Sequence, residues 1–136
     1  QQLQENLEKA LDQTMPKHAL YWKQQLKDAT GKDPRAFTSN NGYSLQTLKC
    51  AWAAITHTPI STRSPTDHFR EALEEAVRAG NDADTVACVA GALLGAMWGM
   101  GAMPIDWLGQ IHGWPDMNFD ALINLGVNTY GLNHNG

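Results

Sequence analysis

The spacing of the apolar residues is the feature that most constrains the fold of this 136-residue chain. Near the N-terminus they recur at i, i+4, i+7, i+8 and i+12, as Leu3, Leu7, Ala10, Leu11 and Met15. This recurrence follows the helical period of about 3.6 residues and predicts a helix that buries one face. No segment shows the two-residue alternation with β-branched residues that is typical of strands. The sequence therefore predicts an all-α fold.

Prolines, glycines and polar loop residues divide the chain into further helical segments. Ser44 and Thr66 are expected to be the N-caps of two helices, and Gly80 is expected to follow the C-terminal end of the second. Helices are predicted over about 3–15, 18–29, 44–55 and 66–79, from the turn at 81–85 to about 100, at 104–108, and from 119 to the polar tail at 133.

Charge and hydropathy exclude two classes of partner. Lys and Arg number 10 and Asp and Glu number 14, which gives a net charge of −4. The sequence thus implies no basic surface for nucleic acid or for an anionic membrane. The longest apolar stretch, 86–103, approaches the length of about 18 residues at which a membrane span is considered. It contains four glycines and has no basic flank, so we interpret it as a buried helix.

Cysteines and histidines show no metal-binding spacing. Cys50 and Cys88 both lie in apolar, helix-like surroundings. We therefore expect reduced and buried thiols in a cytoplasmic protein. The histidines form no HxxxH pattern. Each of them, including His68, is expected in a loop or on the surface.

The helix that follows residue 85 is rich in glycine. Gly91, Gly95 and Gly99 recur every four residues and so share one helix face. Glycine in a helix interior costs about 1 kcal/mol relative to alanine. The pattern predicts a central helix that a neighbouring backbone approaches closely, and a ligand cavity against the glycine face is the alternative.

One local pattern has a direct chemical interpretation. Asp82 and Asp84 are two residues apart at the start of this helix, and the hydroxyl of Thr85 follows them. Carboxylate and hydroxyl oxygens are ligands that suit Mg²⁺ or Mn²⁺. The alternative is that Asp82 or Asp84 caps the helix, an interaction worth about 1 kcal/mol. The two hypotheses are compatible, because a capping carboxylate keeps a second oxygen for a cation.

Several short segments follow one another in a definite order between about residues 15 and 110. They are 42–48 (GYSLQTL), 69–77 (FREALEEAV), 80–87 (GNDADTVA), 90–99 (AGALLGAMWG) and 103–108 (MPIDWL). In this order they resemble the ADP-ribosylglycohydrolase family. The segment at 80–87 is similar to the metal motif of that family, G-[GN]-D-x-D-T.

The resemblance implies an all-α hydrolase built around two Mg²⁺ or Mn²⁺ ions. Its expected substrates are ADP-ribosylated protein side chains or small molecules that contain ADP-ribose. By the family motif, Asp82, Asp84 and Thr85 would be metal ligands, and Gly42 and Tyr43 would lie in the loop that lines the ADP-ribose cleft. The metal ions would hold the ribose hydroxyls and polarise or position the attacking water. The resemblance identifies no general base in this chain.

The chain also departs from the family pattern. Family members are longer, and their N-terminal half carries a Thr/Ser-Asp-Asp motif with further ligands, which is absent here. We therefore expect residues 1–136 to be a single partial domain, the C-terminal portion of the family domain, with an exposed apolar face. It would supply half of the metal site, and a missing N-terminal segment or a second chain would complete the enzyme. The alternative is a non-catalytic helical interaction or structural module.

Overall fold

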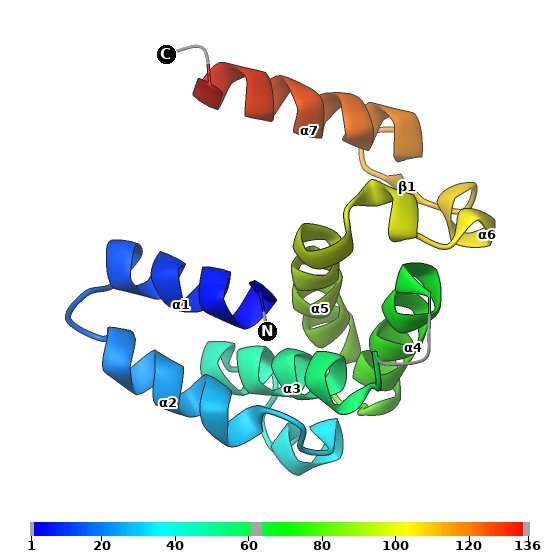
Figure 1. The fold of residues 1–136 in the computed structure, drawn as a ribbon. Helices are drawn as coiled ribbons and strands as arrows, with labels where there is room; N and C mark the ends of the chain where they lie inside the picture. The colour runs from blue at the N-terminus through cyan, green and yellow to red at the C-terminus, as the bar shows by residue number, and fades with distance from the viewer. Residues whose placement is uncertain (1, 61–63, 135–136) are drawn as a thin grey trace. The chain divides into compact units, whose positions relative to one another are not determined.

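The computed structural model describes residues 2–60 and 64–134, and these are mainly helical (Figure 1). The α-helices are α1 (Gln2–Thr14), α2 (Ala19–Ala29), α3 (Ser44–His57), α4 (Pro65–Arg78), α5 (Ala83–Trp98), α6 (Ile105–Leu108) and α7 (Phe119–His134). The 3-10 helices are η1 (Pro34–Phe37) and η2 (Met100–Ala102). The prediction of an all-α fold is confirmed.

One short hairpin interrupts the helices. Strands β1 (His112–Gly113) and β2 (Met117–Asn118) pair antiparallel, with His112 opposite Asn118. Strands of two residues are too short to show an alternation in the sequence, so the hairpin was not predictable from it. Across the described ranges, every helix falls short of the length and apolar character needed to cross a membrane.

The chain forms two compact units, Gln1–Ala102 and Met103–Gly136. In the first unit α3 is the central helix and contacts α2, α4, α5 and η1. Its buried residues are Thr47, Cys50, Ala51, Trp52, Ala53, Ala54 and Ile55. The prediction that the glycine-rich helix is central is wrong, because α5 buries only one stripe, formed by Val86, Ala90 and Leu94. The alanines of α3 let neighbouring helices pack on several of its faces.

The N-terminal stripe of leucines forms as predicted. Leu3, Leu7 and Leu11 of α1 are half-buried and pack against the cluster that contains Leu26 and Trp52. None of the α1 side chains is fully buried. The attachment of α1 therefore depends on this single apolar face, and one ion pair to α2, between Lys23 and Asp12 at 2.7 Å, supports it.

Helix α4 begins with a capping box. Ser64 is the N-cap, the Asp67 amide donates to its Oγ at 3.1 Å, and the Asp67 carboxylate accepts from the Ser64 amide at 3.4 Å. The predicted N-cap Thr66 is wrong by two residues, because Pro65 occupies the first helical position, where its missing N–H costs nothing. Gly80 follows the C-cap with φ of 84°, as predicted.

His68 is buried, so the prediction that it lies in a loop or on the surface is wrong. It shares the inward face of α4 with Ala72 and Ala76. Its Nδ1 accepts a hydrogen bond from Trp98 Nε1 at 3.0 Å, and its Nε2 lies 3.2 Å from the Ile55 carbonyl oxygen. These partners select the neutral ring with its proton on Nε2. Burial lowers the pKa of His68 below its usual value.

The two thiols differ in their exposure. Cys50 is buried in α3, as predicted, and burial raises the pKa of its thiol. Cys88 is exposed, contrary to the prediction. Cys88 lies two residues from Val86 and from Ala90, which places it about 200° around the helix from each. Because Val86 and Ala90 face the core, Cys88 faces away from it.

The glycines of α5 do not mark a close helix contact. A Cβ on Gly91 would meet only the tip of Leu73, at 3.8 Å, and Gly95 and Gly99 have no described neighbour within 4 Å of that position. The prediction of a closely approaching backbone is therefore wrong for the described part of the chain. Gly99 has a different role, since its φ of 75° ends the helix.

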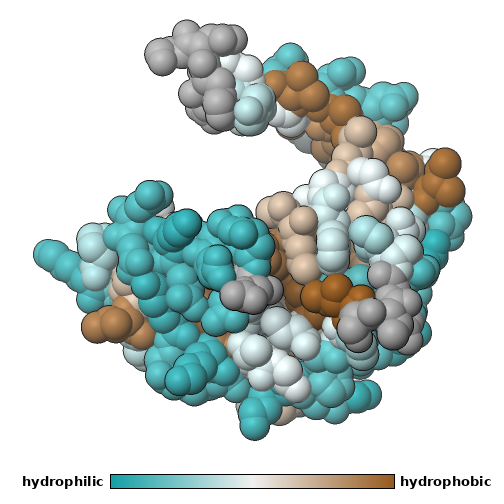
Figure 2. All heavy atoms as spheres, in the orientation of Figure 1, coloured by the Kyte–Doolittle hydropathy of each residue, from teal (hydrophilic) through white to brown (hydrophobic). Residues whose placement is uncertain are grey.

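The described surface carries apolar as well as polar side chains. Polar side chains cover much of α1 and α2 on the visible face (Figure 2). Leu20 of α2 is nonetheless 86% exposed. In the second unit, exposed apolar side chains lie along α7 (Figure 2), namely Leu122, Leu125, Val127 and Tyr130. A single continuous apolar face stays a prediction.

Candidate functional site

The acidic turn between α4 and α5 has a backbone that few sequences can adopt. Gly80 and Asn81 both lie in the left-handed region, with φ of 84° and 56°. Glycine and asparagine are the residues that accept this region at least cost. The turn closes with a hydrogen bond of 2.8 Å from the Ala83 amide to the Asn81 carbonyl. Asp82 is thereby placed as the N-cap residue of α5.

The three predicted metal ligands interact with one another. Thr85 Oγ1 donates a hydrogen bond to Asp82 Oδ1 at 2.9 Å. The pKa of Asp84 lies below its usual value, first because of a side-chain hydrogen bond with Asp82 and then because backbone amides of the turn stabilise its charged form. Two carboxyl groups in such contact are stable when they share a proton or a cation. Asp84 and Thr85 are exposed and Asp82 is half-buried.

The capping hypothesis does not account for Asp82. Its side chain makes no hydrogen bond to a free amide of the helix, although it stands at the N-cap position. Its Oδ1 is occupied by the Thr85 hydroxyl instead. For Asp84, in the first turn, nearby backbone amides favour the charged form of the carboxyl and so help to lower its pKa.

Gly42 lies directly against this turn. A Cβ on Gly42 would stand 2.7 Å from Asp82 Oδ2, closer than real Cβ contacts allow. The structure therefore brings together two residues that are 40 positions apart and were predicted separately. Tyr43 is 60% exposed and is the N-cap residue of α3. It takes the position predicted for Ser44, which is instead the first residue of the helix.

Asn41 joins the two loops, and the sequence did not single it out. This side chain is 1% exposed. Its Oδ1 accepts a hydrogen bond from the Asp82 amide at 3.0 Å, and its Nδ2 donates to the Gly80 carbonyl at 3.0 Å. Nearby, Asn81 Nδ2 donates to the Thr38 carbonyl at 2.9 Å. Asn41 lies among other loop-type residues, and no local pattern distinguishes it from them.

The donor set fits a hard cation, but only in part. Asp82, Asp84 and Thr85 offer carboxylate and hydroxyl oxygens, the atoms that Mg²⁺ and Mn²⁺ prefer. Within the described ranges, no group of three His, Cys, Asp or Glu side chains converges on a common point. A cation at this turn would therefore need water or other groups to complete its shell.

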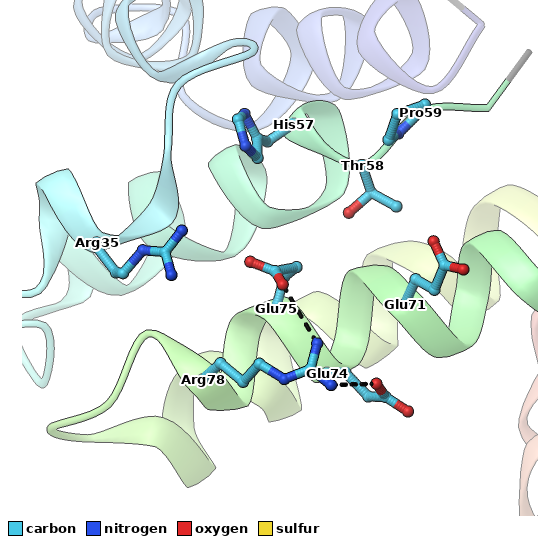
Figure 3. A pocket seen from close by; sticks show the side chains of 8 residues that line it. All are labelled: Arg35, His57, Thr58, Pro59, Glu71, Glu74, Glu75 and Arg78. Atoms are coloured by element: carbon cyan, nitrogen blue, oxygen red, sulfur yellow. Dashed lines mark hydrogen bonds and ion pairs between the residues drawn. The ribbon is translucent and has the colours of Figure 1, made fainter.

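A hollow in the first unit, separate from the acidic turn, is lined by charged side chains (Figure 3). Its volume is about 690 Å³, and none of the predicted site residues is among those that line it. Arg78 forms ion pairs with Glu74 at 2.7 Å and with Glu75 at 3.3 Å across this surface. Arg78 thus offsets part of the negative charge of the glutamates that line the hollow. The residues around it are Arg35, His57, Thr58, Pro59, Glu71, Glu74, Glu75 and Arg78.

Comparison with known proteins decides the family. The model of the family named ADP-ribosylglycohydrolase matches residues 1–132. The chain belongs to this family. The match spans both the Gly42 loop and the acidic turn, whose contact the structure shows, and it confirms the resemblance drawn from the five motifs.

Two curated relatives of the chain are named ADP-ribosylarginine hydrolase Tri1. The protein from Serratia proteamaculans (strain 568) is 33% identical over 72 residues, which are 53% of this chain and 18% of that protein. The protein from Pseudomonas putida (strain GB-1) is 32% identical over 72 residues, 53% of this chain and 17% of that protein. In both cases the matched part spans less than a fifth of the relative. No solved structure matches the chain.

Proposed function

We propose that the protein to which this chain belongs is an ADP-ribosyl hydrolase that removes ADP-ribose from arginine side chains of modified proteins. The observation that supports this most is the contact between Gly42 and the acidic turn, since it joins two motifs of the matched family. The names of the two relatives support arginine as the linked side chain. Related ADP-ribosyl compounds are further candidate substrates.

In this proposal, Asp82, Asp84 and Thr85 supply one half of a dinuclear Mg²⁺ or Mn²⁺ site. Their oxygens suit either ion, and the hydrogen bond from Thr85 to Asp82 holds two of the three side chains together. Ions held there would supply Lewis-acid chemistry, which would bind ribose hydroxyls and polarise an attacking water. Because these residues provide few anionic oxygens, the remaining ligands would come from another segment or a second chain.

Gly42 and Tyr43 would line the ADP-ribose cleft. Gly42 has no side chain, which leaves room for the Asp82 carboxylate beside the backbone. The Tyr43 side chain is largely exposed at the start of α3, where its ring is accessible to a ligand. A nucleotide base or ribose could pack on such a ring, since aromatic faces bind apolar and stacked groups.

Asp84→Asn tests the proposed metal site. Asp84 lies in the first turn of α5, and Asp120, an exposed aspartate in the first turn of α7, offers a matched control with the same charge change. Mn²⁺ binding to the chain can be measured by electron paramagnetic resonance, which detects the free ion. Binding should weaken in Asp84→Asn and not in Asp120→Asn. Equal binding by both variants and the unmodified chain would contradict the metal assignment.

Release of ADP-ribose from an ADP-ribosylarginine peptide tests the reaction. The assay uses the full-length protein with Mg²⁺ or Mn²⁺, together with its Asp84→Asn and Asp120→Asn variants. We expect release by the unmodified protein and the Asp120 variant, and strong loss in the Asp84 variant. If the unmodified protein binds metal but releases no ADP-ribose from any linkage, the non-catalytic helical module becomes the better description.

A further inference from the structure

Asn41 occupies an unusual position in the first unit. Most of its loop is exposed, yet its own side chain is 1% exposed. Both polar atoms of the buried amide have partners, as buried polar groups require. The Asp82 amide donates to Oδ1 and the Gly80 carbonyl accepts from Nδ2, both at 3.0 Å. The side chain therefore contacts the turn on either side of Asn81.

The backbone of Asn41 is itself anchored to a buried helix. Its carbonyl accepts a hydrogen bond of 2.6 Å from Thr47 Oγ1, and Thr47 is 3% exposed in α3. Because α3 is the central helix of the unit, this hydrogen bond fixes the backbone of Asn41 to the core. The hydrogen bonds of the Asn41 side-chain amide then fix the backbone of Asp82 to the same core.

The direct bond to the Asp82 amide distinguishes Asn41 from the other residue that joins the two loops. Asn81 Nδ2 also crosses between them, to the Thr38 carbonyl at 2.9 Å, but Asn81 bonds no atom of Asp82 through its side chain. Gly42, the next residue after Asn41, provides the space for Asp82 Oδ2. Asn41 therefore sets the backbone from which the carboxylate projects, and Gly42 provides room for it.

We infer that Asn41 is a positioning residue, which holds the Asp82 carboxylate in the single orientation needed for ligand binding at the acidic turn. The inference deepens the proposed function and rests on it for the identity of the ligand. The orientation itself is a property of the metal-free chain and can be measured there.

The test compares Asn41→Ala with Asn81→Gly. The control removes the other interloop hydrogen bond, and glycine keeps the left-handed backbone that residue 81 requires. Three-bond couplings in the nuclear magnetic resonance spectrum of the metal-free chain report the χ1 rotamer of Asp82. We expect one rotamer in the unmodified chain and in Asn81→Gly, and averaging over several in Asn41→Ala.

Amide hydrogen exchange and Mn²⁺ titration add two further measurements. Exchange of the Asp82 amide should accelerate in Asn41→Ala beyond any change at core amides of α3. Mn²⁺ affinity should fall about 10–100-fold, as it does when partners that orient metal ligands are lost, and should change little in Asn81→Gly. A structural role alone would affect both variants alike.

The outcomes separate this inference from the proposed function. A single Asp82 rotamer in folded Asn41→Ala, or equal effects of the two variants, would overturn the role of Asn41. If Asn41→Ala does not fold, the unmodified chain tests the role of Asn41. Averaging of the Asp82 rotamer in that chain, or rapid exchange of its Asp82 amide, would also overturn this role. An unmodified chain that shows one rotamer but binds no Mn²⁺ would instead contradict the metal site and leave the positioning role supported.

Discussion

Replacement of Gly42 by alanine should damage the site without unfolding the chain. Gly42 is exposed and is not among the glycines with positive φ, so alanine introduces no backbone strain there. The new Cβ would stand 2.7 Å from Asp82 Oδ2, and the two atoms must separate by about 0.7 Å to reach the 3.4 Å of an ordinary contact. The movable partner is the Asp82 side chain, because Gly42 is followed at once by Tyr43, the N-cap residue of α3.

The two consequences for stability nearly cancel. Alanine at a compatible glycine position stabilises the folded state by about 0.4–1 kcal/mol, because it restricts the unfolded chain. Displacement of the carboxylate weakens its hydrogen bond with Thr85, and a bond to a charged group contributes about 1.5–3 kcal/mol when buried. Thr85 is exposed and Asp82 is half-buried, so the loss is smaller. We expect the free energy of unfolding to change by about 1 kcal/mol or less.

Metal binding should change much more than stability. Metal–ligand distances are satisfied within about 0.2 Å, so a displacement of about 0.7 Å removes Asp82 from a preformed site. We expect Mn²⁺ affinity to fall at least about tenfold, which corresponds to about 1.4 kcal/mol.

Urea unfolding and Mn²⁺ titration measure the two effects of Gly42→Ala side by side. Gly109→Ala is the control, since Gly109 has φ of −68° and no neighbour within 4 Å of a new Cβ. Mn²⁺ affinity in Gly42→Ala equal to that of the unmodified chain would refute the reasoning. Destabilisation above about 3 kcal/mol would show instead that Gly42 serves folding.

Three further predictions concern stability and reactivity. Burial lowers the pKa of His68, so the unfolded chain protonates this ring at a higher pH than the folded chain does. The free energy of unfolding in urea should therefore fall as the pH drops below about 6.5. A flat or opposite trend contradicts this. Trp98→Phe, which leaves the His68 Nδ1 without its donor, should cost about 1–3 kcal/mol in thermal or urea unfolding. Cys88 should react with a thiol reagent in the native chain, and Cys50 only after unfolding.

The helices were predictable because each carries its own local signal. The stripe from Leu3 to Leu11 sits in α1, and the prolines and glycines between elements fall in turns. Most predicted ends lie within one or two residues of the observed ones. The N-cap of α4 was misplaced because Pro65 can open a helix as well as interrupt one, and the sequence permits both positions.

The buried face of each helix was harder to predict, because it depends on the neighbours of the helix. Helix α5 is apolar around most of its circumference, so nothing local shows that Val86 faces inward and Cys88 outward. His68 has the opposite problem. A histidine on an inward face is favourable only when both ring nitrogens find partners, and these come from α3 and α5.

The chemistry of the acidic turn is local, but its geometry is not. Asp82, Asp84 and Thr85 form a contiguous motif and could therefore be predicted from a short stretch of sequence. The orientation of Asp82 depends on hydrogen bonds and space from Asn41 and Gly42, about 40 positions away. The motif alone therefore does not make a site. A chain with the same acidic turn but without an amide and a glycine in the facing loop should keep the capped helix and lose the oriented carboxylate.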